Sequence, residues 1–126
     1  MIGITGVATT TVTFYSTAKA VGSGSLEVFS TPMMIALMEK AACNCLSKEL
    51  EPGQTSVGTH ICIDHMAASA CNANVSADAV IDSVEGRKII FKVSAWEGDK
   101  QIGYGTHVRV IVDARKFMGK LGGVTA

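Results

Sequence analysis

The chain has no excess of charge of either sign. Eleven Lys and Arg residues balance eleven Asp and Glu residues among its 126 residues. No overall electric field therefore attracts nucleic acid or an anionic membrane, and neither is expected as a partner. The densest basic segment, with Arg109, Arg115, Lys116 and Lys120, is diluted by Asp113 and suffices only for a local phosphate contact.

The chain also lacks long apolar runs and a recognisable leader. No apolar run approaches the roughly 20 residues that span a bilayer. The first 14 residues contain no basic residue and include five threonines, which is not the composition of a signal peptide. We therefore expect a cytoplasmic protein.

The cysteines are not spaced for metal binding. The four cysteines are Cys43, Cys45, Cys62 and Cys71. Cys43 and Cys45 would point about 200° apart on a helix, so they cannot chelate one ion together. No Cys/His spacing matches a zinc site, and we predict small buried thiols, no metal and no cofactor.

Only two prolines occur, and they indicate the two ends of one predicted helix. Ser30 or Thr31 can cap a helix that has Pro32 in its first turn, where a missing N–H is harmless. Pro52 ends it, so the helix is predicted to run to about Leu50.

Extended segments surround this helix. Residues 8–15, rich in Thr, Val and Phe, predict an early strand, residues 16–29 a connecting loop, and residues 116–121 a terminal helical turn. Between the helix and that turn, apolar residues alternate at period two, with turns at residues 85–86 and 98–99, which predicts four strands. Their alternating sets are Val57, Thr59, Ile61 and Ile63; Val75, Ala77, Ala79 and Ile81; Ile89, Phe91, Val93 and Ala95; and Thr106, Val108, Val110 and Val112.

One helix, an early strand and a four-strand antiparallel meander predict an α+β fold over residues 1–126, as a single domain. The curved sheet must wrap around the helix, because nothing else is long enough to cover its apolar stripe. A sheet of this kind keeps exposed edges, so we expect association into a dimer.

Glu39 is a charged residue at the rim of that apolar stripe. Met34, Met38, Ala41, Ala42 and Cys45 cluster within roughly 100° around the helix, and Glu39 lies near 140°. Either Glu39 reaches water from the boundary, or it is a partly desolvated acid of the kind found at working sites.

Several short motifs occur in a specific order along the chain. They are Ser30-Thr31-Pro32-Met33-Met34 at the helix start, Glu39, Ser56-Val57-Gly58-Thr59-His60, Asp64-His65-Met66-Ala67-Ala68, Val84-Glu85-Gly86-Arg87 and Gly103-Tyr104-Gly105-Thr106-His107-Val108-Arg109. Together they resemble the fluoroacetyl-CoA thioesterase-like branch of the hotdog-fold thioesterases, and the resemblance covers about residues 7–121.

The resemblance implies a hotdog fold, thioester hydrolysis and an active site of Thr31, Glu39 and His65. The spacings of eight positions from Thr31 to Glu39 and twenty-six from Glu39 to His65 agree with the family pattern. It also implies that the Gly58 N–H polarises the thioester carbonyl. In this fold the site forms at a dimer interface, so we expect His65 to face Glu39 of the other subunit in a homodimer or a dimer of dimers.

These residue types suit the chemistry. Glu39 can attack the carbonyl or activate a water, and the sequence does not separate the two routes. His65 can serve as base or acid, and Thr31 can hydrogen-bond Glu39 or the substrate. Gly58 lets the thioester approach the backbone.

Each residue also has a structural interpretation. Thr31 can be a helix cap, His65 a structural histidine and Gly58 a bulge residue. His60 is interpreted as an edge residue. His107 and Arg109 are interpreted as the polar face of their strand rather than as a substrate or CoA-phosphate site.

The substrate that we predict is a short- or medium-chain acyl-CoA, of which coenzyme A is part. Members specialised for the fluorinated substrate carry aromatic residues in a lid before the helix, whereas residues 21–29 hold Phe29 as their only aromatic. An acyl-CoA hydratase is a rival, although its Asn-Pro loop is absent from this sequence. The second rival is a non-catalytic protein that binds acyl-CoA or an acyl carrier.

Overall fold

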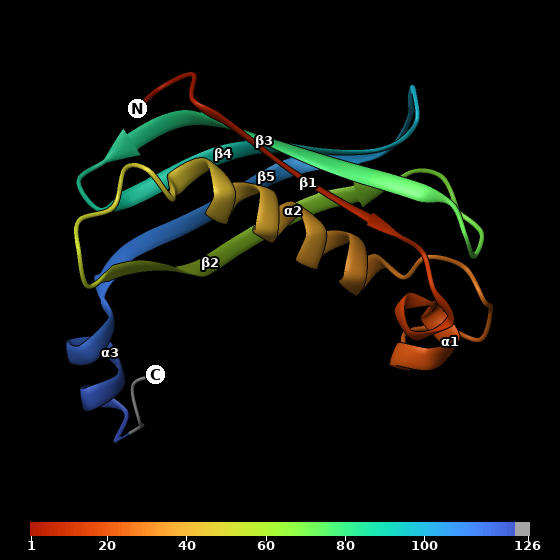
Figure 1. The fold of residues 1–126 in the computed structure, drawn as a ribbon, viewed down its shortest axis with the longest axis horizontal. Coiled ribbons are helices and arrows are strands. Elements are labelled where there is room, and N and C mark those ends of the chain that lie inside the picture. Colours follow the sequence, from red (N-terminus) through yellow and green to blue (C-terminus); the bar gives the residue numbers. More distant parts are fainter. Residues whose placement is uncertain (123–126) are drawn as a thin grey trace.

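In the computed structural model, which describes residues 1–122, a five-stranded antiparallel sheet curves around one long helix (Figure 1). The strands lie in the order β1-β3-β4-β5-β2. Their bounds are β1 Thr5–Thr11, β2 Gln54–His65, β3 Asn74–Glu85, β4 Lys88–Glu97 and β5 Lys100–Asp113. The helices are α1 Ala18–Val21, α2 Thr31–Leu46 and α3 Ala114–Lys120, with a 3₁₀ turn at Phe14–Ser16.

Helix α2 forms where the local signals predict it. Ser30 is the N-cap, and its Oγ accepts a hydrogen bond from the Met33 N–H at 3.2 Å, with Pro32 in the first turn. The apolar stripe is buried against the concave face of the sheet. A Cβ at Gly6 would collide with the backbone of Ala41 and Cys45, so β1 and α2 touch almost backbone to backbone.

The curved antiparallel sheet around a central helix confirms the predicted α+β architecture. Several details differ. Helix α2 ends at Leu46 rather than near Leu50, and the loop predicted for residues 16–29 contains the short helix α1. Cys45 is buried, but Cys43 and Cys62 are exposed, so the prediction of buried thiols is wrong for those two. Residues 123–126 of the predicted domain lie outside the described residues.

The predicted four-strand meander is wrong at its first strand. Only β3, β4 and β5 form a meander, and β2 crosses to pair with β5 at the far edge of the sheet. The predicted inner faces of β3 and β4 are buried. In contrast, the alternating set on β2 is not buried, and Ile61 is 36% exposed. Because β2 pairs only with β5, its other edge has no neighbouring strand among the described residues.

The last strand faces the other way from the prediction. His107, Arg109 and Ile111 point toward the helix and are buried, while Thr106, Val108 and Val110 lie on the outer face. Within residues 1–122, no helix has the length and apolarity needed to cross a membrane.

Candidate active site

Thr31 and His65 form a close polar pair at one end of the sheet. Thr31 opens α2 and His65 ends β2, and Thr31 Oγ1 lies 2.8 Å from His65 Nδ1. This is hydrogen-bond distance between a hydroxyl and a potential base. Burial lowers the pKa of His65, with a smaller opposing effect of the Ala67 backbone, so the ring is neutral at pH 7.

A cavity opens beside this pair. Small side chains and backbone form most of its wall, which consists of Ala18, Ser23, Val28, Phe29, Ser30, Thr31, His65, Met66, Ala67 and Ala68. The second ring nitrogen, His65 Nε2, is buried and has no hydrogen-bond partner among the described residues. A buried polar atom without a partner is uncommon and marks a place where a further group is expected to bind.

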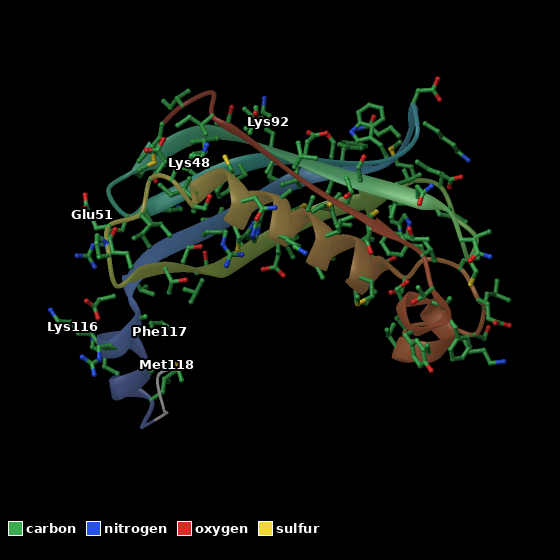
Figure 2. The ribbon with its side chains drawn as sticks, in the orientation of Figure 1. Lys48, Glu51, Lys92, Lys116, Phe117 and Met118 are labelled. Carbon is green, nitrogen blue, oxygen red and sulfur yellow. The ribbon has the colours of Figure 1, made fainter. Side chains whose placement is uncertain are left out.

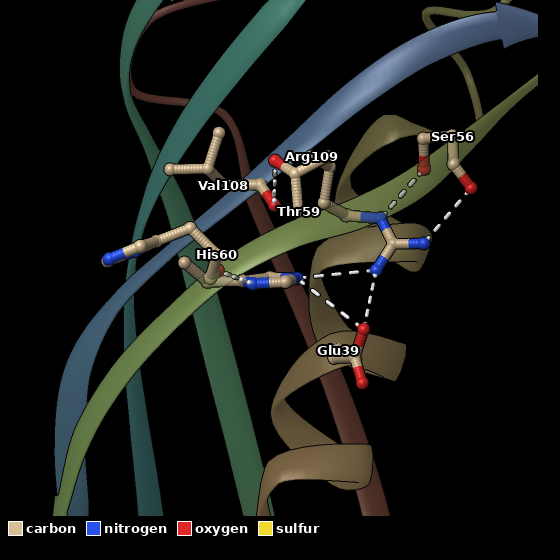
Figure 3. Close-up of polar contacts among 7 residues, drawn as sticks. Glu39, Ser56, Thr59, His60, Val108 and Arg109 are labelled. Atoms are coloured by element: carbon tan, nitrogen blue, oxygen red, sulfur yellow. Dashed lines mark hydrogen bonds and ion pairs between the residues drawn. The ribbon is translucent and has the colours of Figure 1, made fainter.

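Glu39, on α2, belongs to a second cluster, which it forms with residues of β5 and β2 at one edge of the sheet (Figure 3). Its Oε2 accepts a hydrogen bond from Arg109 Nη1 at 3.0 Å and lies 3.8 Å from His107 Nε2. The Glu39 side chain is 42% exposed, whereas the Arg109 and His107 side chains are 8% and 2% exposed. The carboxylate therefore stands between a buried cation and solvent.

Arg109 is itself fixed by β2. Its Nε donates to Ser56 Oγ at 2.8 Å, and its Nη2 donates to the Ser56 carbonyl at 3.1 Å. These two bonds leave Nη1 directed at Glu39, as Figure 3 shows. A guanidinium held at three nitrogens orients the carboxylate as well as balancing its charge.

His107 completes the support of this cluster. Its Nδ1 lies 2.7 Å from the His60 carbonyl, which only accepts, so Nδ1 carries the hydrogen. Burial lowers the pKa of His107, and the Arg109 guanidinium also lowers it, against the opposing effects of the His60 carbonyl and Glu39. The neutral ring therefore presents a lone pair at Nε2, 3.3 Å from Arg109 Nη1.

Gly58 leaves the space that Glu39 occupies. A Cβ at this position would lie 2.6 Å from Glu39 Oε2 and 3.2 Å from His107 Cε1. The β2–β5 register also shifts between Gly58 and His60, so the glycine lies at an irregularity of the strand. Gly58 thus gives room to the carboxylate, and a small cavity lined by Glu39, Gly58, Thr59, His60, Ile61 and His107 adjoins it.

The structure brings together two pairs of the predicted site residues but not all four. Thr31 contacts His65, and Glu39 Oε2 occupies the space that a Cβ on Gly58 would need. Thr31 and Glu39 are separated by eight helical residues, or about 12 Å along the axis. Gly58 and His65 are seven residues apart on a strand, or roughly 23 Å. Within one chain, the predicted site residues therefore form two separate polar clusters.

Arg109 and His107 were missed as parts of a site by sequence reasoning, which interpreted them as a solvated strand face. Both are buried and contact Glu39. The available signal was the shared alternation of His107 and Arg109 with Ile111, which places all three on one strand face. No three His, Cys, Asp or Glu side chains converge as a metal site within residues 1–122.

Comparison with known proteins places this geometry in a family. Residues 12–115 match the family described as fluoroacetyl-CoA-specific thioesterase. The fluoroacetyl-CoA thioesterase of Streptantibioticus cattleyicolor is 43% identical over 95 residues, covering 75% of this chain and 68% of that protein.

Solved structures agree with this match. A variant of the fluoroacetyl-CoA thioesterase FlK, in complex with acetyl-CoA, superposes with a TM-score of 0.91 at 34% identity, covering 97% of this chain and 96% of the other. A hot-dog-like protein from Thermanaerovibrio acidaminovorans shares the fold alone, with a TM-score of 0.86 at 21% identity over 96% of this chain and 90% of its own.

These matches confirm the fold, the family and the enzyme class predicted from the motifs, and they favour an enzyme over a non-catalytic binding protein. The chain belongs to the fluoroacetyl-CoA-specific thioesterase family of the hotdog fold and is a thioester hydrolase.

Proposed function

We propose that this thioester hydrolase cleaves short- or medium-chain acyl-CoA as a homodimer, with Thr31 and His65 of one protomer facing Glu39 and Gly58 of the other. The observation that carries the proposal is the division of the site. The Thr31–His65 pair is within hydrogen-bond distance, whereas Glu39 lies about two helical turns away beside Arg109.

The free edge of β2 supports the pairing of two chains. This strand of 12 residues has no Lys, Arg or Pro, and its one acidic residue, Asp64, lies next to its end. Long uncharged edge strands are rare in monomers because they pair with other chains. Antiparallel pairing of two β2 strands about a twofold axis between Ile61 and Cys62 would set Gly58 of one strand opposite His65 of the other.

The two clusters, joined in the proposed dimer, contain the groups that thioester hydrolysis needs. Glu39 either attacks the carbonyl carbon, forming an anhydride that a water then hydrolyses, or removes a proton from a water that attacks the carbonyl, and both routes break the C–S bond. The thiolate of CoA then takes up a proton, and the acid is released. Neutral His65, bonded to Thr31, has both a hydrogen and a lone pair for these transfers. The Gly58 N–H is proposed to stabilise the oxyanion.

The wall of the Thr31–His65 cavity supports a broad acyl preference. Phe29, the only aromatic residue in residues 21–29, is buried rather than exposed at the entrance. Most other side chains that line this cavity are small, among them Ala18 and Ser23. We therefore propose that fluoroacetyl-CoA, the substrate named for the relative from Streptantibioticus cattleyicolor, is not singled out here.

A panel of acyl-CoA thioesters, assayed for released thiol, tests this proposal. We expect turnover of acetyl-, butyryl- and hexanoyl-CoA, and a loss of at least about 100-fold in Glu39→Gln and in His65→Ala, the scale for removal of an acid or base. Strong preference for fluoroacetyl-CoA over acetyl-CoA would refute the substrate range. Full activity in both variants would remove these residues from the mechanism.

A further inference from the structure

Helix α3 concentrates positive charge on a neutral protein. Its seven residues include Arg115, Lys116 and Lys120 and no acidic residue. All three cations are exposed, and none takes part in the ion pairs formed among residues 1–122. The neighbouring Asp113 is used as the helix cap, because its Oδ1 accepts from the Lys116 N–H at 3.0 Å.

The helix stands at the corner of the sheet where β2 begins. Asp113, the last residue of β5, pairs with Gln54, the first residue of β2, and the Ala114 N–H donates to the Gly53 carbonyl at 3.0 Å. Figure 1 shows α3 projecting from this corner, away from the body of the sheet. In Figure 2, Lys116 points outward from it.

The cavity beside Thr31 and His65 lacks cations. None of its ten lining residues is Lys or Arg. Acyl-CoA carries a diphosphate and a 3′-phosphate at the end of the pantetheine arm opposite the thioester. These groups are strongly anionic, and phosphates bind best to Arg and Lys side chains. The cations that receive them must therefore come from outside this cavity wall.

The proposed pairing of two chains along β2 supplies these cations. In an antiparallel pair, the start of β2 in one protomer lies beside the end of β2 in its partner. Helix α3 adjoins the start of β2, because Asp113 pairs with Gln54, so in the proposed dimer it would lie just beyond the Thr31–His65 end of the partner. The helix is about 10 Å long, which extends its charges outward from that cavity.

We propose that the basic face of α3, formed by Arg115, Lys116 and Lys120, binds the phosphate groups of CoA whose thioester lies in the Thr31–His65 cavity of the partner protomer. This inference rests on the proposed dimer and substrate class. The CoA phosphates would then bind to one subunit, while His65 comes from the other.

Neutralising α3 tests the site. The variant Arg115→Gln, Lys116→Gln, Lys120→Gln should raise the Kd for CoA in calorimetry, and the KM for acyl-CoA, about 10-fold, since each exposed charge pair contributes a small factor. Its kcat should be unchanged, as should its KM for an acyl-pantetheine thioester, which has no phosphate. Added salt should raise the KM of the wild type but change that of the variant little.

A matched control removes three positive charges elsewhere. The control replaces Lys48, Lys88 and Lys92: Figure 2 shows the labelled Lys48 and Lys92 away from α3, and Lys88 is paired with Glu85 at 3.7 Å. Their replacement by Gln should leave the Kd for CoA unchanged. An unchanged Kd in the α3 variant overturns the proposal, as does an equal rise in the control. Calorimetry with CoA needs no hydrolysis, so a failure of the proposed substrate range would be seen separately, in the thiol assay.

A mixed dimer tests whether α3 acts on the partner. One chain carries His65→Ala and a native α3, and the other carries the three α3 substitutions and a native His65. The surviving His65 then faces the native α3 across the interface, and we expect the wild-type KM for acyl-CoA. The raised KM of the α3 variant in this mixed dimer would show that α3 serves its own chain and would overturn the assignment.

Discussion

At the scale of single residues, Arg109 determines where the Glu39 carboxylate stands. It reaches Glu39 Oε2 at 3.0 Å while two bonds to Ser56 hold its other nitrogens. A lysine keeps the charge but cannot make this set of bonds. We expect Arg109→Lys to lower kcat about 10- to 100-fold through misplacement of Glu39. Steady-state kinetics measure this, with the exposed Arg87→Lys as control, and an unchanged kcat would contradict the role.

Gly58 gives a second prediction at the same scale. Because a Cβ there would lie 2.6 Å from Glu39 Oε2, Gly58→Ala must displace the carboxylate. We expect kcat to fall up to about 100-fold. Gly119→Ala, where a Cβ has nothing within 4 Å, is the matched control and should keep full activity. Wild-type kcat in Gly58→Ala would show that the position of Glu39 is not critical.

The pH dependence follows from His65. Burial disfavours its charged form, so the neutral ring persists to lower pH than in an ordinary histidine of pKa about 6.5. If neutral His65 is the active form, the acid limb of kcat/KM falls below pH 6.5. A kcat/KM profile between roughly pH 4.5 and 8 measures it. A midpoint above 6.5 would mean that His65 is held charged, contrary to its burial.

At the scale of elements, the proposed dimer depends on the edge of β2. Ile61 lies on this edge strand and is 36% exposed. A lysine there places a charge in the proposed interface, and charged edges prevent strand pairing. We expect Ile61→Lys to be a monomer by light scattering and to lose most of its activity.

Val7→Lys is the control for this change. Val7 is 57% exposed on β1, the opposite edge strand of the sheet. This variant should remain a dimer and stay active. A wild-type monomer, or an active monomeric Ile61→Lys, would contradict the proposed assembly.

The elements that sequence predicted well are those with local signals. Ser30 and Pro32 fixed the start of α2, and the alternation on β3 and β4 matched their buried faces. The path of β2 to the far edge of the sheet could not be read from its own residues, because strand order depends on long-range pairing. The four residues of α1 are too few to show a helical period.

For the candidate site too, the sequence predicted some residues and missed others. The motif resemblance predicted Thr31 and His65 as members of one site with Glu39, and Thr31 contacts His65 rather than Glu39. Arg109 was missed because its partner Glu39 is 70 positions away, and a polar residue alternating on a strand has the same pattern whether it faces water or a buried acid.

At the scale of the whole molecule, the proposed active site is built from two chains. Each protomer would give Thr31 and His65 to one site and Glu39, Gly58 and Arg109 to the other. A monomer then has no complete site, although all five residues are present in it. Activity should therefore depend on protein concentration when the dimer dissociates.

Complementation between two inactive variants tests this claim most directly. Homodimers of Glu39→Gln and of His65→Ala should each lose at least about 100-fold in kcat. In the mixed dimer, one site combines the intact His65 of the first chain with the intact Glu39 of the second. We predict that the purified mixed dimer recovers about half of the wild-type kcat, since one of its two sites is whole. A mixed dimer as inactive as its parents would place both residues in one chain's site and contradict the account.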